Sequence, residues 1–212
     1  MQMTKAYKTI AERATAEFVE RRSRFIGSIM PVQTEAEAIA FINELKSTYW
    51  DANHNAYAYR IREGQLKRYS DDGEPQGTAG VPALDVLERE DLVDVCVVVT
   101  RYFGGILLGG GGLIRAYGHG AKIAVDAAVI KHMRPCTRFS LECGYEWYGK
   151  LEHLLPRFET VVESTDFGAV VRMQLYLPTE QVGGFQKALT DLTSALVVPV
   201  QMGTLFADIP VQ

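Results

Sequence analysis

Four arginines of this 212-residue chain stand beside glycines, aromatic residues or turns, where a guanidinium group is able to meet a ligand. They are Arg24, Arg68, Arg101 and Arg115. A planar guanidinium donates paired hydrogen bonds that match the oxygens of a phosphate. If the four side chains converge, they suit a nucleic-acid backbone. The alternative for any one of them is an ion pair with a nearby carboxylate, for instance Arg68 with Asp71 or Asp72.

Glycines precede the helical pattern that starts at Leu113. The candidates for phosphate contact are Gly110, Gly111 and Gly112. A glycine-rich loop that opens a helix presents free backbone N–H groups at the positive end of the helix dipole. The spacing is neither a P-loop nor a dinucleotide-binding GxGxxG. A purely geometric role, a tight turn with close helix packing, stays open, and either role predicts that Gly109–Gly112 tolerates added bulk poorly.

An acidic turn, Asp71-Asp72-Gly73-Glu74-Pro75, offers oxygen ligands or a general base through Asp71, Asp72 and Glu74. Acidic residues in a Gly-Pro turn more often bond to local amides, and no EF-hand or HExxH pattern accompanies them. We therefore expect a supporting structural loop, no metal and no cofactor.

His54 starts a predicted strand, where a base, a phosphate contact and a hydrogen-bonded structural residue are all open, with the structural role favoured. Tyr69, Tyr102 and Phe103 are able to stack on bases, although each alone is expected in the core. Neither a serine nor a cysteine stands in a nucleophile motif, so a covalent hydrolase is not expected.

The first half of the chain must position these residues with alternating strands and helices. A strand is predicted over 17–32, and Thr34 with Glu37 forms a capping-box pattern that opens a helix. The patterns that follow predict a hairpin over 54–61 and 66–69, a helix over 78–87, a strand over 93–100 and a helix from Leu113. The strand over 93–100 is almost entirely β-branched, which predicts burial on both faces at the centre of its sheet. The last helix has a face of small residues that permits close packing.

The second half repeats the alternation after a polar joint at Lys131–Pro135. Strands are predicted near 137–144, 159–164, 171–177 and 196–201, with helices near 148–155 and after Thr179 as a cap. Asp166-Phe167-Gly168 is interpreted as a hairpin turn. The order βαββαβ is the ferredoxin-like plan. We therefore predict an α+β protein with domains at 1–132 and 136–212.

Composition limits the class of protein. Hydrophobic residues make up 47% and charged residues 23%, as in globular proteins, and the net charge of −4 argues against a diffusely basic nucleic-acid binder. The longest uncharged run, 192–207, is shorter than the roughly 18 residues of a membrane helix, and no signal peptide is visible, so we expect a cytoplasmic protein away from membranes. Three cysteines, an odd number, predict reduced and mostly buried thiols.

Two stretches resemble the IMPACT family in its bacterial YigZ branch. They are RYSDDGEPQGTAGVP at 68–82 and VVTRYFGGILLGGGGLIRAY at 98–117, and 22–26 and 51–54 resemble the family's opening. The resemblance implies an N-terminal α/β sandwich with the fold of the second domain of a small-subunit ribosomal protein. It implies a C-terminal ferredoxin-like domain similar to one in elongation factor G.

The resemblance also implies a link to translation, because eukaryotic relatives regulate the stress kinase that acts on translation initiation. Our first hypothesis is a regulatory or binding protein whose N-terminal domain contacts RNA, the ribosome or a translation factor. Arg68, Arg101 and Arg115, with Asp72 and Glu74, are expected to line one face. The alternative is a nucleotide- or phosphate-ester-dependent enzyme that uses the glycine-rich loop and the acidic turn. The lack of a recognisable base or P-loop lysine favours binding over catalysis.

Overall fold

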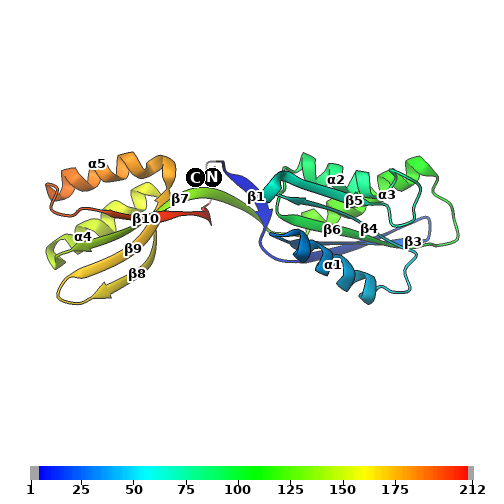
Figure 1. The fold of residues 1–212 in the computed structure, drawn as a ribbon, viewed down its shortest axis with the longest axis horizontal. Helices are drawn as coiled ribbons and strands as arrows, with labels where there is room; N and C mark the ends of the chain where they lie inside the picture. The colour runs from blue at the N-terminus through cyan, green and yellow to red at the C-terminus, as the bar shows by residue number, and fades with distance from the viewer. Residues whose placement is uncertain (1–4, 210–212) are drawn as a thin grey trace. The chain divides into compact units, whose positions relative to one another are not determined.

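The computed structural model describes residues 5–209, which form two compact units (Figure 1). One unit holds Tyr7–Lys131 and the other holds the chain from His132 onward. Both mix helices with antiparallel strands, so the predicted α+β class is confirmed. The predicted joint at Lys131–Pro135 is not a loop, because strand β7 (Ile130–Cys143) runs through it. Pro135 fits this strand because pairing with the neighbouring β9 begins only at Cys136.

The first unit, the N-terminal domain, is built on an antiparallel sheet in the order β2-β3-β6-β4-β5. Its strands are β2 (Ala14–Glu20), β3 (Ser23–Pro31), β6 (Val95–Tyr102), β4 (His54–Ile61) and β5 (Leu66–Ser70). The short strand β1 (Tyr7–Ile10) pairs with β7, and the 3-10 turn η1 (Glu63–Gln65) joins β4 to β5. The predicted hairpin and the central place of the β-branched strand are confirmed.

Helices cover both faces of this sheet (Figure 1). The helix α1 (Glu35–Thr48) packs on the face that carries Cys96 and Val98 of β6. The helices α2 (Gly80–Arg89) and α3 (Gly110–Asp126) pack on the opposite face, where Val95, Val97 and Val99 point. Successive strand residues therefore face opposite layers, as strand geometry requires. Two hydrophobic cores result, with β6 contributing to both.

The segment predicted as a strand over 17–32 is instead a hairpin of β2 and β3. Glu20 pairs with Ser23, so Arg21 and Arg22 alone form the turn, with φ of 44° and 65°. Two-residue hairpin turns with positive φ at both positions normally use Asn-Gly, so arginines at both positions gave no turn signal in the sequence. The predicted cap is present, because Thr34 Oγ1 accepts a hydrogen bond from Glu37 N; the Glu37 carboxylate accepts from Gln33 N rather than from Thr34.

Glycines allow α3 to lie directly on the sheet, as its small-residue face predicts. A Cβ atom built on Gly27 of β3 would lie 2.0 Å from the carbonyl oxygen of Gly120, and one built on Gly120 would lie 2.8 Å from Val99 Cγ1. Both distances are shorter than any carbon contact tolerates, so this part of the helix requires glycine on both sides. The close packing fixes the height of α3, and of the residues at its start, over the sheet.

The second unit follows the predicted βαββαβ order, with its sheet in the ferredoxin-like order β10-β7-β9-β8. Its further elements are α4 (Tyr145–Leu154), η2 (Leu155–Phe158), β8 (Val161–Phe167), β9 (Val171–Pro178), η3 (Thr179–Gln181), α5 (Val182–Thr193) and β10 (Val200–Asp208). Thr179 opens η3 instead of capping α5, β8 extends through Phe167 into the residues predicted as a turn, and β10 starts later than predicted. Asp208 at its end pairs with Met133, so the paired strand continues past the uncharged run, and its carboxylate accepts a hydrogen bond from His132 N.

Cys96, Cys136 and Cys143 are free and buried, as predicted. Burial raises the pKa of the Cys96 thiol, which keeps this sulfur protonated and unreactive. Among residues 5–209, no helix is long and apolar enough to cross a membrane.

Candidate functional site

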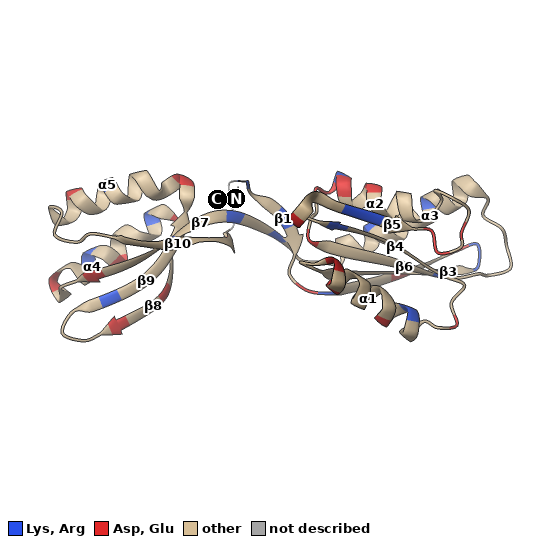
Figure 2. Ribbon diagram, in the orientation of Figure 1, with Lys and Arg blue, Asp and Glu red and all other residues tan. Residues whose placement is uncertain are grey.

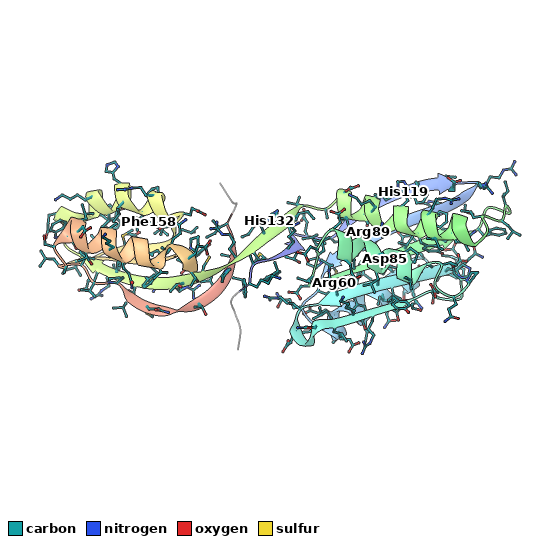
Figure 3. All side chains as sticks on the ribbon, turned by 90° about the horizontal axis from the view of Figure 1, so that it is seen from above. Arg60, Asp85, Arg89, His119, His132 and Phe158 are labelled. Carbon is teal, nitrogen blue, oxygen red and sulfur yellow. The ribbon has the colours of Figure 1, made fainter. Side chains whose placement is uncertain are left out.

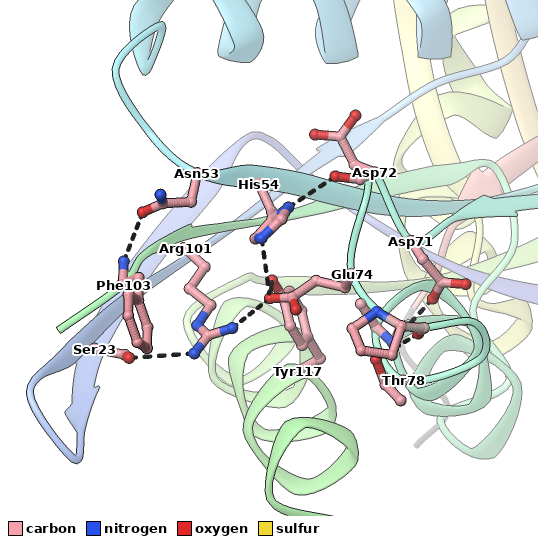
Figure 4. A network of polar contacts seen from close by, with 12 residues as sticks. Ser23, Asn53, His54, Asp71, Asp72, Glu74, Thr78, Arg101, Phe103 and Tyr117 are labelled. Carbon is pink, nitrogen blue, oxygen red and sulfur yellow. Dashed lines mark hydrogen bonds and ion pairs between the residues drawn. The ribbon is translucent and has the colours of Figure 1, made fainter. Parts of the chain in front are cut away.

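A buried polar cluster lies between the end of β6, the acidic turn and α3 (Figure 4). Arg101 Nη1 donates a 2.6 Å hydrogen bond to Glu74 Oε1, and the Tyr117 hydroxyl donates to the same oxygen at 2.7 Å. The side chains of Arg101 and Glu74 are only 6% and 4% exposed. Arg101 also lies between the rings of Phe25 and Phe103, with 5.5 and 5.4 Å from its central carbon to the ring centres. Burial first, and then the bond to Glu74, raises the pKa of Tyr117, so this phenol remains a donor.

His54 belongs to the same cluster because His54 and Phe25 both stand opposite Arg101 on neighbouring strands. Its Nδ1 lies 2.9 Å from the carbonyl oxygen of Asp72, and its Nε2 lies 3.8 Å from Glu74 Oε1 (Figure 4). A carbonyl only accepts hydrogen bonds, so Nδ1 carries the proton. In the neutral ring, the lone pair of Nε2 therefore points to the Glu74 side.

Asp71 holds the acidic turn to the start of α2. Its carboxylate accepts hydrogen bonds from the backbone N–H groups of Gly77, Ala79 and Gly80, at 2.8, 3.0 and 2.8 Å. Burial alone would raise the pKa of Asp71, but these three N–H groups together hold it below its usual 3.8. Ala79 stands at the N-cap position of α2, and its methyl side chain accepts no hydrogen bond. Asp71 therefore caps the helix in its place.

Asp72 is equally occupied by the protein itself. Lys46 Nζ lies 2.6 Å from its Oδ1, and the backbone N–H of Asn55 donates to its Oδ2 at 2.7 Å. Within residues 5–209, no group of three His, Cys, Asp or Glu side chains is arranged to hold a metal ion. These bonds account for Asp71 and Asp72 as supports of the turn.

A cavity of about 380 Å³ opens over the buried cluster. Its polar lining includes His54, Glu74 and Arg101, and its apolar lining includes Phe103 and Leu107. Leu107 is 81% exposed and Phe103 44% exposed, so the loop from Phe103 to Gly109 forms a raised apolar rim. The expectation that Phe103 lies in the core is therefore wrong.

The glycine cluster divides into residues that require glycine and residues that do not. Gly109 has φ of 73°, and a Cβ on Gly112 would lie 2.9 Å from Leu108 Cβ. Gly110 has open space around it, and Gly111 meets only the Arg115 guanidinium at 3.8 Å. The prediction that the whole segment resists added bulk is thus wrong for Gly110 and Gly111, because both occupy ordinary helical backbone at the exposed start of α3.

A second cavity, of about 250 Å³, lies on the other side of Leu108. Its ionisable lining comes from Arg21 in the strained turn, Glu20 beside it, and Arg115 and His119 of α3. The carboxylate of Glu20 lies 4.0 Å from Arg21, whereas Arg115 has no hydrogen-bond or ion-pair partner within residues 5–209. The N-terminus of α3 thus lies between the first cavity, which we call the apolar cavity after its rim of Phe103 and Leu107, and the second, which we call the basic cavity after Arg21 and Arg115.

The turn and the glycine loop are fixed to each other. A Cβ atom on Gly104 would lie 2.0 Å from the carbonyl carbon of Arg22, so the loop backbone rests directly on the turn. The Ser23 hydroxyl accepts a hydrogen bond from Gly104 N at 3.2 Å and lies 3.4 Å from Arg101 Nη2. We call the surface formed by Arg21, Arg22, Phe103, Leu107 and Arg115 the α3 tip.

The remaining arginines lie elsewhere. Arg68 stands opposite Tyr59, whose side chain packs under α1, so Arg68 is on the α1 face while Arg115 is on the α3 side. Arg24 also points to the α1 face and forms an exposed ion pair with Glu17 at 2.6 Å. The expectation that Arg68, Arg101 and Arg115 line one face is therefore wrong. The face on which Arg68 lies depends on how β5 pairs with β4, and the sequence around Arg68 alone does not determine that pairing.

A groove between α2 and α3 is lined by Arg115 and by Asp85, Arg89 and His119, which Figure 3 labels. Basic and acidic residues alternate along it, and Figure 2 shows the same interspersion over the helices and strands of each domain. Arg68 and Arg89, like Arg115, form no ion pair within residues 5–209, so what distinguishes Arg115 is its place beside Arg21 in one cavity.

Sequence reasoning missed Arg21 and Tyr117 as members of the site. Helical spacing was available for Tyr117, which follows Leu113 by one turn on the buried face of α3. Arg21 carried no such signal, because its position depends on a turn that its residue type does not favour.

This architecture, with an α/β sandwich followed by a ferredoxin-like domain, defines a known class of two-domain proteins. Residues 21–125 match the Impact N-terminal domain, and residues 141–195 match a domain of unknown function (DUF1949). The IMPACT family member YvyE of Bacillus subtilis is 38% identical over 193 residues, which cover 91% of this chain and 89% of that protein. The chain belongs to the IMPACT family.

Other relatives agree. The IMPACT family member in the pol 5′ region of Thermus thermophilus is 40% identical over 82% of this chain and 94% of its own. Protein IMPACT of Xenopus laevis is 38% identical over 96 residues, 42% of this chain and 30% of its own. A solved structure described as that of a hypothetical protein has 31% identity and a TM-score of 0.60, and covers 93% of this chain and 98% of its own.

Proposed function

We propose that this protein is a translation-associated binding protein whose N-terminal domain contacts RNA through the α3 tip. The observation that carries the proposal is Arg115, which lines a basic cavity with Arg21 and lacks an acidic partner within residues 5–209. Arg115 lies five residues after the first residue of α3, near the positive end of the helix, where a second positive charge is unfavourable. A phosphate bound between Arg115 and Arg21 relieves this repulsion.

The strained turn supports the same proposal. Non-glycine residues with positive φ cost roughly 1–3 kcal/mol each, and such strain concentrates at functional sites. Arg21 and Arg22 both carry this cost and are both exposed. The turn places the Arg21 side chain in the lining of the cavity that Gly112 and Arg115 of α3 also line, a combination that suits a phosphate backbone.

Family membership supports the link to translation, because the resemblance implies such a role for eukaryotic relatives.

The enzyme alternative has less support from the site. Asp71 and Asp72 are engaged in bonds that hold the turn, and Glu74 is neutralised by Arg101. A protein surface, on the ribosome or on a translation factor, is the other kind of partner, and the experiment separates it from RNA.

The test is co-sedimentation of the full chain with ribosomes and with purified RNA in low and high salt. We expect binding to both in low salt and release in high salt, because phosphate contacts are salt-dependent. The variant pair Arg115→Ala and Arg68→Ala provides the control, since both residues are exposed arginines of the same domain on opposite faces. Binding to ribosomes but not to RNA, or salt-resistant binding, would point instead to a protein partner and contradict RNA contact.

A further inference from the structure

The apolar cavity contains two hydrogen-bond acceptors that the protein leaves unused. Glu74 Oε1 is occupied by Arg101 and Tyr117, but no hydrogen bond within residues 5–209 uses its other oxygen, Oε2. Nε2 of His54, the ring nitrogen that does not face the Asp72 carbonyl, lies 3.8 Å from the same carboxylate and is an acceptor in the neutral form of the ring. Both side chains line the cavity, so two neighbouring acceptors face one space.

Neither acceptor is a buried unpaired atom, so water reaches both, and a ligand that supplies two donors at this place would replace that water. The Arg101 side chain, which neutralises Glu74, is 6% exposed. The pair Glu74–Arg101 carries no net charge, which disfavours a cationic ligand. A neutral ligand with two adjacent N–H groups fits best.

The rest of the lining favours a flat, apolar body. Phe103 borders the cavity with an exposed ring, and Leu107, Leu113 and Pro75 provide apolar contacts. The volume of about 380 Å³ falls within the range of small-molecule sites. Aromatic side chains at such positions stack on unpaired bases of single-stranded nucleic acids.

We infer that the cavity binds an unpaired guanine base of the RNA held at the α3 tip. Guanine presents two adjacent donors, N1–H and the exocyclic N2–H₂, on one edge, whereas the same edge of adenine, cytosine or uracil never has two donors side by side. Glu74 Oε2 and His54 Nε2 accept these two N–H groups while Phe103 packs on the ring. This inference rests on the proposed function, because it takes the backbone on either side of the base to be held by Arg115 and Arg21.

The two cavities are placed for one continuous strand. Leu108 lines both, Gly109 and Gly110 border the apolar cavity, and Gly112 borders the basic one. The first turn of α3 therefore lies between the base and the phosphate sites, with its free N–H groups facing the connecting backbone.

The test measures affinity of the full chain for nine-residue oligouridines that carry one central guanosine, inosine or adenosine. Inosine lacks only the N2 amino group. We expect guanosine to bind about tenfold more tightly than adenosine, the order of one base-specific contact, with inosine between them. Phe103→Ala should weaken the guanosine oligomer by about tenfold, the order of one stacked base, whereas the matched Ile106→Ala, in the same loop but outside the cavity lining, should not.

The comparison of the three oligomers uses the parent protein, so it stays valid even if Phe103→Ala fails to fold. Equal affinity for the three oligomers would overturn the guanine pocket. If Arg115→Ala still weakens all three equally, the proposed RNA contact stands and only the pocket is wrong; if no oligomer binds, both are wrong. Binding of guanosine monophosphate as tightly as the oligomer would also overturn the inference, since the pocket would then serve a free nucleotide.

Discussion

Replacing Arg101 with methionine should destabilise the N-terminal domain far more than a surface change does. The substitution keeps most of the apolar contact with Phe25 and Phe103 but leaves the Glu74 carboxylate, 4% exposed, with only Tyr117 as a hydrogen-bond donor. Breaking a buried ion pair on one side costs about 3–5 kcal/mol. Tyr117→Phe removes one hydrogen bond to the same carboxylate and should cost about 2 kcal/mol.

The double variant Glu74→Leu with Arg101→Met separates charge burial from packing. Because it removes both charges, it should be more stable than Arg101→Met alone, although it contains one more substitution. Urea unfolding of the full chain gives the midpoints, and hydrogen exchange of the β6 amides reports the N-terminal domain specifically. A loss below about 1 kcal/mol for Arg101→Met, or a double variant less stable than Arg101→Met, would refute the buried pair as described.

Three further predictions concern stability. Gly27→Ala on β3 should lower the unfolding free energy by about 1–3 kcal/mol, since its Cβ would lie 2.0 Å from the Gly120 carbonyl oxygen. Gly118→Ala on α3 meets only Pro82 Cβ at 3.8 Å and should stabilise by about 0.5 kcal/mol; equal melting temperatures of the two variants would contradict the close packing. Asp71→Asn should lower the unfolding free energy by about 1 kcal/mol at pH 7. Folding lowers the pKa of Asp71 below 3.8, so the stability difference between this variant and the parent should shrink as the pH falls below about 4. Urea midpoints at pH 7 and pH 3 measure this change. Gly111→Ala should leave the melting temperature unchanged or raised, and a drop of several degrees would mean that the start of α3 is tighter than its 3.8 Å contact implies.

The local patterns predicted most elements because they depend on the residues within them. The β-branched run at Val95–Val99 required a strand buried on both faces, and it is the central β6. Thr34 and Glu37 placed the start of α1 correctly. The small residues of α3 predicted its close approach to the sheet, which Gly27 and Gly120 permit.

The parts that the sequence did not predict depend on partners far along the chain. Arg21 and Arg22 form a turn that is held by pairing of the flanking strands, and their residue types favour no such turn. Arg68 resembled Arg115 as a candidate, but the register with Tyr59 sends it to the opposite face. The role of Glu74 became visible only when Arg101 and Tyr117, distant in sequence, met the same oxygen.

The salt dependence of RNA affinity for the parent and for Arg115→Ala tests the central claim most directly. Each phosphate contact to a single strand contributes about 0.7 to the slope of log K against log salt. Arg115→Ala should therefore weaken binding for every sequence and lower the slope by about 0.7, while Arg68→Ala should retain the parent slope. Parental affinity and slope in Arg115→Ala, or an equal loss in Arg68→Ala, would contradict RNA binding at the α3 tip.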